Sequence, residues 1–139
     1  MKKIGLGIAV IVLGWFVGSI VNMGFIQLGH QLLPIPNMDI NNMEELAKAM
    51  PNLKPKYFLF PFLGHALGTL AGAFVAALLA ISHKIKFALV IGVLFLLGGI
   101  AINYMLTGPL WFTITDILLA YIPMAWIGGL VAIRIKRTS

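Results

Sequence analysis

Five polar residues are the candidates for chemistry in this sequence, namely His65, Asp116, Asn103, Asn22 and His30. Each stands within or at the edge of a long apolar run, where an ionisable or strongly polar side chain is a functional hypothesis by default. A histidine beside a carboxylate can relay protons, hold a cation or orient an anionic headgroup. We therefore take these five residues as one candidate polar cluster for binding, with His65 and Asp116 as its central pair.

A structural interpretation of the same residues stays open. Thr113 to Asp116 has the spacing of a capping box, in which Thr113 would cap a helix and Asp116 would satisfy free backbone N–H groups. His65 would then only bond a loop carbonyl. The asparagines would make ordinary hydrogen bonds between helices, worth about 0.6 kcal/mol each, rather than line a hydrated pocket open to the outside.

Cofactor and metal sites have little support. His30 and His65 would reach similar depths in antiparallel helices, as axial haem ligation needs, but a lone histidine at a helix end is usually interfacial. The chain has no cysteine, and its methionines do not repeat as a ligand motif. No nucleotide-binding loop, metalloprotease motif or nucleophile elbow occurs in the sequence. We expect no cofactor, no metal and no catalytic residue.

The composition places these polar residues in a membrane. Of the 139 residues, 60% are hydrophobic and only 10% are charged, against roughly 25% charged residues in soluble domains. Four apolar runs, at 4–33, 58–82, 87–106 and 113–133, reach the roughly 20 residues that cross a bilayer. The sequence therefore predicts an all-α integral membrane protein, a bundle of four transmembrane helices forming a single domain over residues 1–139.

The outer loop, 34–57, contains a further helical signal. Asn42 and Glu45 form a capping box, and Met43, Leu46 and Met50 then fall on one helical face. This pattern predicts a short amphipathic helix in the first extracytoplasmic loop, lying on the bundle or on the membrane surface.

The basic residues predict the orientation. Seven of them flank one side of the predicted spans without a single acidic residue: Lys2, Lys3, Lys84, Lys86, Arg134, Lys136 and Arg137. The positive-inside rule then puts both termini in the cytoplasm and the protein in the cell (inner) membrane. Because these residues stand at the ends of apolar runs and form no stripe, we expect no nucleic-acid partner.

Small residues mark the predicted contact between helices. Residues of this kind recur at every fourth position in the first two spans: Gly14, Gly18, Gly64, Gly68, Gly72 and Ala76. On a helix they form a stripe without bulky side chains, a glycine zipper, against which another backbone can pack closely. The opposite face of the second span, which includes Leu70 and Phe74, is expected to meet lipid.

Three functions are compatible with these features. The first is a non-enzymatic membrane subunit that packs against membrane lipids and a partner, either a second copy of itself or another membrane protein. The second is a small transporter, or a lipid- or ion-binding protein, that uses the polar cluster facing outward. The third, and the least supported, is a membrane enzyme acting on a lipid-borne substrate.

Overall fold

The computed structural model describes residues 2–138, and no strand occurs among them. The helices are α1 (Lys2–Leu32), α2 (Met43–Ala49), α3 (Leu59–Leu79), α4 (Lys84–Met105), α5 (Leu110–Leu119) and α6 (Ile122–Thr138), with 3₁₀ turns η1 (Met50–Asn52) and η2 (Pro55–Phe58) before α3. Four segments are long and apolar enough to cross a membrane: Ile4–Leu32, Pro55–Leu79, Lys84–Met105 and Leu110–Arg137. The predicted helical class and the four apolar spans are thereby confirmed.

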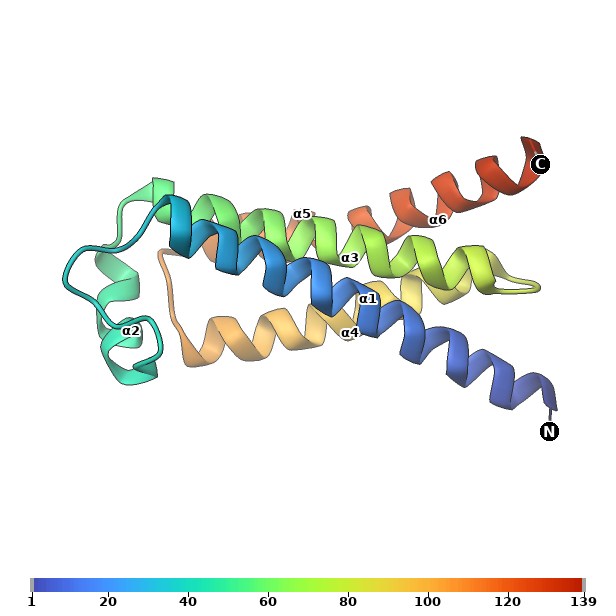
Figure 1. The fold of residues 1–139 in the computed structure, drawn as a ribbon, viewed down its shortest axis with the longest axis horizontal. Helices are drawn as coiled ribbons and strands as arrows, with labels where there is room; N and C mark the ends of the chain where they lie inside the picture. Colours follow the sequence, from blue (N-terminus) through green and yellow to red (C-terminus); the bar gives the residue numbers. More distant parts are fainter. Residues whose placement is uncertain (1, 139) are drawn as a thin grey trace.

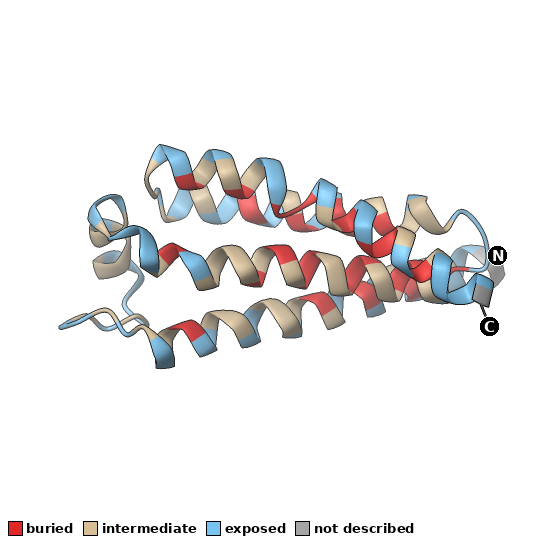
Figure 2. Cartoon of the chain, turned by 90° about the horizontal axis from the view of Figure 1, so that it is seen from above, coloured by how far each residue is buried: buried red, intermediate tan, exposed pale blue. Residues whose placement is uncertain are grey.

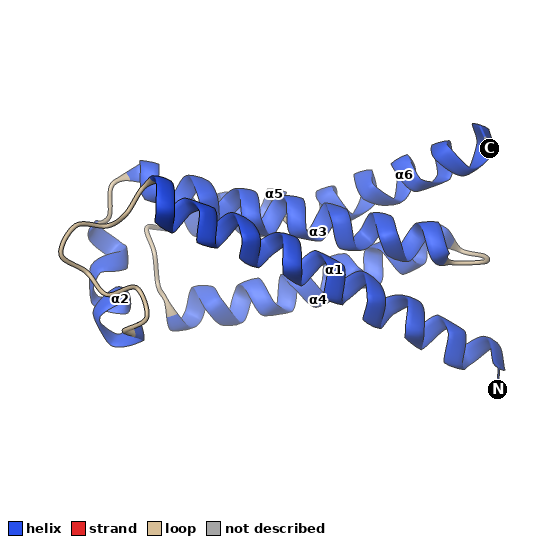
Figure 3. Ribbon diagram, in the orientation of Figure 1, coloured by secondary structure: helices blue, strands red, loops and turns tan. Residues whose placement is uncertain are grey.

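The four long segments run lengthwise beside one another (Figure 1). Both described ends of the chain lie at one end of the molecule, and α2 lies at the other, beside the longer loops (Figure 3). Helix α3 occupies the centre, because it contacts α1, α4 and α6. Buried positions accordingly follow the sides of the helices that face one another, whereas the outer surfaces are exposed or partly exposed (Figure 2).

Glycines bring α1 and α3 into backbone contact. A Cβ atom placed on Gly14 would lie 2.7 Å from the carbonyl oxygen of Gly72, and one placed on Gly18 would lie 2.6 Å from that of Gly68. The Cβ of Ala76 lies 2.9 Å from the point where a Cβ atom on Gly14 would be. Cβ atoms in proteins do not come this close to a backbone atom. We call the contact of Gly14 and Gly18 with Gly68 and Gly72 the glycine interface.

The opposite face of α3 does not meet lipid as predicted. A Cβ atom on Gly128 of α6 would lie 2.5 Å from the carbonyl oxygen of Leu70 and 3.1 Å from the backbone nitrogen of Phe74. The backbone of α6 therefore packs against α3 at this point. The expected lipid contact at Leu70 and Phe74 was wrong because their large side chains can lie on either side of a glycine in a neighbouring helix. The periodicity of one helix does not reveal which helix lies next to it.

The last span begins earlier than predicted and is interrupted. Its first helix, α5, starts at Leu110 rather than Thr113, and a turn at Ala120 and Tyr121 separates it from α6, which starts at Ile122. Pro123 explains the break, because its ring excludes a regular helix over the preceding turn and it cannot donate a backbone hydrogen bond. Both residues at the break are buried, with Ala120 at 0% and Tyr121 at 1% exposure.

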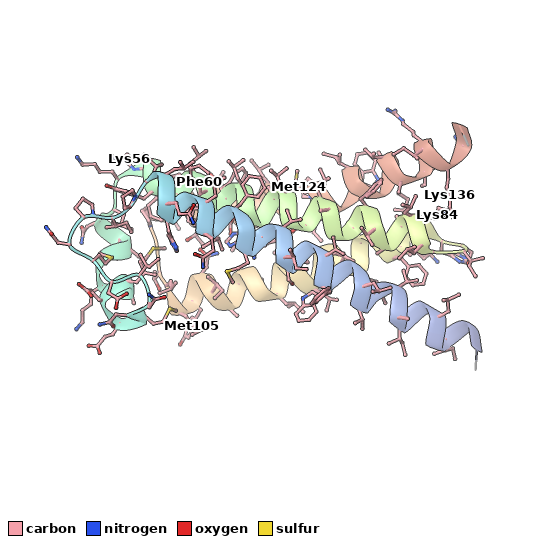
Figure 4. The ribbon with its side chains drawn as sticks, viewed as in Figure 1. Lys56, Phe60, Lys84, Met105, Met124 and Lys136 are labelled. Atoms are coloured by element: carbon pink, nitrogen blue, oxygen red, sulfur yellow. The ribbon has the colours of Figure 1, made fainter. Side chains whose placement is uncertain are left out.

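The two ends of the bundle have different polar features. In the outer loop, Asn42 caps α2, its Oδ1 accepting from the backbone N–H of Glu45 at 3.2 Å; that α2 lies on a membrane surface stays a prediction. At the other end, the ammonium group of Lys84 donates to the carbonyl oxygens of Ala77 (3.0 Å) and Ala80 (2.6 Å), which satisfies the end of α3. Lys84 and Lys136 both lie at this end (Figure 4).

Candidate functional site

His65 and Asp116 are in direct contact inside the bundle. The Nδ1 atom of His65, on α3, lies 2.8 Å from Oδ1 of Asp116, on α5. Asp116 is completely buried, and the side chain of His65 is 12% exposed. The two residues are 51 positions apart in the sequence, so the fold alone brings this pair together.

The capping interpretation of Asp116 is wrong. Helix α5 begins at Leu110 with Pro109 in the capping position, so Thr113 lies inside the helix rather than at its start. Asp116 is then in the second turn, where backbone N–H groups already have helical partners. Its carboxylate instead meets side chains from α3, α4 and the α5–α6 break.

Tyr121 is a third member of the site. Its hydroxyl donates to Oδ2 of Asp116 at 2.8 Å and lies 3.1 Å from Nδ1 of His65. Its phenol packs directly on Gly99 of α4, where a Cβ atom would overlap the ring. On a continuous helix, Tyr121 would point about 140° away from Asp116, since each residue turns about 100°. For that reason the sequence pattern did not place Tyr121 beside Asp116. Its one relevant signal is Pro123, which indicates a break in the helix near Tyr121.

Asn103 and Thr113 extend the contacts toward the α2 end. The amide nitrogen of Asn103 donates to Oδ2 of Asp116 (3.3 Å) and to the carbonyl oxygen of Gly99 (2.9 Å). The hydroxyl of Thr113 donates to Oδ1 of Asn103 at 3.1 Å. Asp116 thus faces three donors from three parts of the chain. We call His65, Asn103, Thr113, Asp116 and Tyr121 the Asp116 cluster.

The hydrogen bonds fix the roles of the imidazole nitrogens. Because a carboxylate accepts, Nδ1 of His65 carries the proton that points at Asp116. In the neutral ring, Nε2 is then an acceptor. Within residues 2–138 no group hydrogen-bonds to Nε2, and this atom is accessible rather than buried. The carboxylate therefore orients the ring and leaves one nitrogen for another molecule, the arrangement in which histidines act as bases and ligands.

A cavity of about 190 Å³ lies beside His65, between α1 and α4. Its polar lining comes from Asn22, His65 and Tyr121, and Trp15 contributes an aromatic wall. Trp15 is 51% exposed and Gly98, also in the lining, is exposed, so the mouth is on the side of the bundle, near the middle of α1 and α4. The predicted pocket would open at the outer end, whereas this cavity opens sideways.

Asn22 and His30 occupy different surroundings. Asn22 lines the cavity with His65, and its Oδ1 is buried without a hydrogen-bond partner next to Gly64. His30 lies in the last turn of α1, does not line the cavity, and has a buried Nδ1 without a partner. The structure thus brings four of the five candidates, all but His30, to the cavity or to the cluster behind it. Among the described residues, no three His, Cys, Asp or Glu side chains are grouped as a metal site requires.

Comparison of the chain with protein-family models, with curated proteins and with solved structures gave no match. Function therefore has to be argued from the Asp116 cluster and its cavity.

Proposed function

We propose that this chain is an integral membrane protein that binds the polar end of an amphipathic small molecule or lipid in the cavity beside His65. The observation that carries the proposal is the placement of His65, which is oriented by a buried carboxylate and lines a cavity on the side of the bundle. If the four apolar segments cross a membrane, that mouth faces the acyl chains. A ligand with an apolar tail then reaches the cavity laterally, without passing through water.

The cost of the Asp116 cluster supports a binding role over a purely structural one. A hydrogen bond between helices in a membrane contributes only about 0.6 kcal/mol on average. Burying a carboxylate costs several kcal/mol before its partners compensate, and apolar residues in place of the whole cluster would hold the helices without that cost. A cluster built on a completely buried Asp116 is best explained by the role of His65, the member that borders the cavity and has a ring nitrogen without a partner.

The packing-subunit interpretation loses its main motivation. It was based on the small-residue surface of the second span, and α1 of the same chain covers that surface at Gly64, Gly68 and Gly72. A second copy or another membrane protein would therefore have to use a different surface. An enzyme acting on a lipid-borne substrate would use the same His65–Asp116 pair and would differ from a binding protein by turnover of the bound molecule.

For the location, we propose the inner membrane with both termini in the cytoplasm. The support is the charge distribution, because the side of the termini carries seven basic residues and no acidic residue. A reporter fused after Ser139 is expected to report cytoplasm, and one inserted near Asn52 the outside. The reverse pattern would overturn this orientation.

Ligand retention tests the proposed function. Gly98 lines the cavity and has no neighbouring atom within 4 Å of its Cβ position, so a side chain can be added there, and we expect a leucine to block the mouth. Gly24 also has open space but lies outside the cavity, which makes Gly24→Leu the matched control. After purification in mild detergent, mass spectrometry should find a co-purifying amphiphile with the wild type and with Gly24→Leu, and far less with Gly98→Leu. Identical lipids in all three preparations would overturn the proposal.

A further inference from the structure

We propose that the group recognised in this cavity is an uncharged hydroxyl at the end of an apolar chain. This inference rests on the proposed function and adds the chemical class of the ligand. It follows from three properties of the cavity: the polar atoms that it presents, its size, and the charge behind it.

The cavity presents one acceptor. Because Nδ1 of His65 donates to Asp116, the neutral ring offers the lone pair of Nε2. Asp116 itself is completely buried behind the ring and already faces His65, Tyr121 and Asn103. A ligand in the cavity therefore meets Nε2 rather than the carboxylate.

Asn22 supplies a donor to the cavity. Oδ1 of Asn22 is buried against Gly64. The amide nitrogen of Asn22 is accessible, and no described residue hydrogen-bonds to it. The amide nitrogen is thus the atom of Asn22 that a ligand can reach. A hydroxyl matches this pair, since it donates to Nε2 and accepts from the amide N–H at the same time.

The size of the cavity limits what enters it. A cavity of about 150 Å³ holds one benzene molecule, so the 190 Å³ beside His65 accommodate a headgroup with a few carbons and not a whole lipid. A shallow, open groove follows one face of α4 from Leu94, which also lines the cavity, to Lys86. It is lined by Leu89, Val90 and Val93 and extends about 12 Å along the helix axis. An apolar tail fits along this groove while the headgroup stays at His65.

The charge of the site argues against an anionic headgroup, and its hydrogen-bonding atoms argue against an ammonium group. A carboxylate would bring a second negative charge close to Asp116 in surroundings of low dielectric constant. An ammonium group has no acceptor atom, so it would leave the Asn22 amide N–H unpaired. A hydroxyl satisfies both polar atoms of the cavity without adding a charge.

Three probes with the same tail test this inference: dodecanol, dodecanoate and dodecylamine. Protein stripped of co-purifying lipid is mixed with all three in detergent, and native mass spectrometry identifies the bound probe by its mass. We expect dodecanol to bind about tenfold more tightly than either charged probe, as expected for one additional satisfied hydrogen bond. Gly98→Leu should abolish the adduct, and Gly24→Leu should retain it.

Two side-chain variants make the test specific. Asn22→Ala should weaken dodecanol binding about tenfold through the lost donor, and His65→Leu should do the same through the lost acceptor. His83→Leu is the control, because His83 is exposed in the α3–α4 turn, far from the cavity in sequence and fold. If His65→Leu fails to fold, Asn22→Ala and the probe series still decide the question. Preference for dodecanoate or dodecylamine would overturn the hydroxyl inference and leave the binding function intact. Failure of all three probes to bind would overturn the proposed function itself.

Discussion

The glycine interface and the Asp116 cluster join the same central helix to its neighbours in opposite ways. At the glycine interface, side chains are absent, and the backbones of α1 and α3 touch. In the Asp116 cluster, side chains from α3, α4 and the α5–α6 break reach across and hydrogen-bond to one carboxylate on α5. The first contact depends on volume alone, and the second depends on the chemical identity of each partner.

This difference suggests a division of roles within the fold. Backbone contact through glycines contributes packing and no reactive group, so it serves stability. Directional hydrogen bonds contribute little stability in a membrane but orient a side chain accurately, so they serve a site. Substitutions at the glycine interface should therefore affect folding strongly, and substitutions in the cluster should affect ligand binding more than folding.

The largest expected effect is that of Gly68→Leu. A Cβ on Gly68 would lie 2.8 Å from the carbonyl oxygen of Gly18 and 3.2 Å from Cα of Asn22, so a leucine must separate the two backbones. We expect the free energy of unfolding to fall by about 3 kcal/mol, the upper range for overpacking. Unfolding by denaturant in detergent measures this change. Gly24→Leu, with open space around its Cβ position, is the control, and an equal loss in both variants would show that the glycine interface does not hold α1 to α3.

A smaller loss is expected for Asp116→Leu. This substitution removes the acceptor that faces His65, Tyr121 and Asn103, and three hydrogen bonds of about 0.6 kcal/mol each amount to about 2 kcal/mol. The same unfolding measurement, with the exposed loop variant Asp39→Leu as control, checks the value. A stability equal to or above that of the wild type would show that the cluster does not hold the helices together.

The sequence predicted those parts of the molecule that depend on local pattern. The four apolar spans follow from composition, and His65 with Asp116 was the central pair of one of the two interpretations that the sequence left open. The start of α5 at Leu110 was missed, because the predicted span began only at Thr113 and left Trp111 and Phe112 outside the helix. They are helical residues that pack beside Phe58 instead.

Features that depend on how helices meet could not be predicted. Tyr121 joins the cluster only because the helix breaks at 120–121, which changes the direction of its side chain. The sideways cavity exists because α1 packs against α3 through glycines and leaves a space beside α4. No periodicity within a single helix contains that information.

A double-mutant cycle measures how strongly His65 and Asp116 act as a unit. We expect Asp116→Asn and His65→Gln to be non-additive, because the first removes the charge and the second removes the imidazole from the same 2.8 Å contact. The double variant should be more stable than additivity predicts by about 0.6–1.7 kcal/mol. A second cycle, which pairs Asp116→Asn with His83→Gln, should be additive within about 0.5 kcal/mol. Strict additivity in the first cycle would mean that the pair contributes no coupling to the fold.

The smallest expected effect tests where the cluster ends. The hydroxyl of Thr113 donates to Oδ1 of Asn103 on another helix, whereas the hydroxyl of Thr115 donates to the carbonyl oxygen of Trp111 in its own helix. Thr113→Val therefore removes a hydrogen bond between α5 and α4 and should cost about 0.6 kcal/mol. Thr115→Val removes no bond between helices and should cost less.

Thr113 should also be coupled to Asp116, although the two side chains do not touch. Asn103 accepts from Thr113 and donates to Asp116, so losing the first bond frees the amide to rotate and weakens the second. A cycle of Thr113→Val with Asp116→Asn should then be non-additive, while the cycle with Thr115→Val should not be. If both threonines give the same result, the ordered part of the cluster ends at Asn103, and His65 is oriented by Asp116, Tyr121 and Asn103 alone.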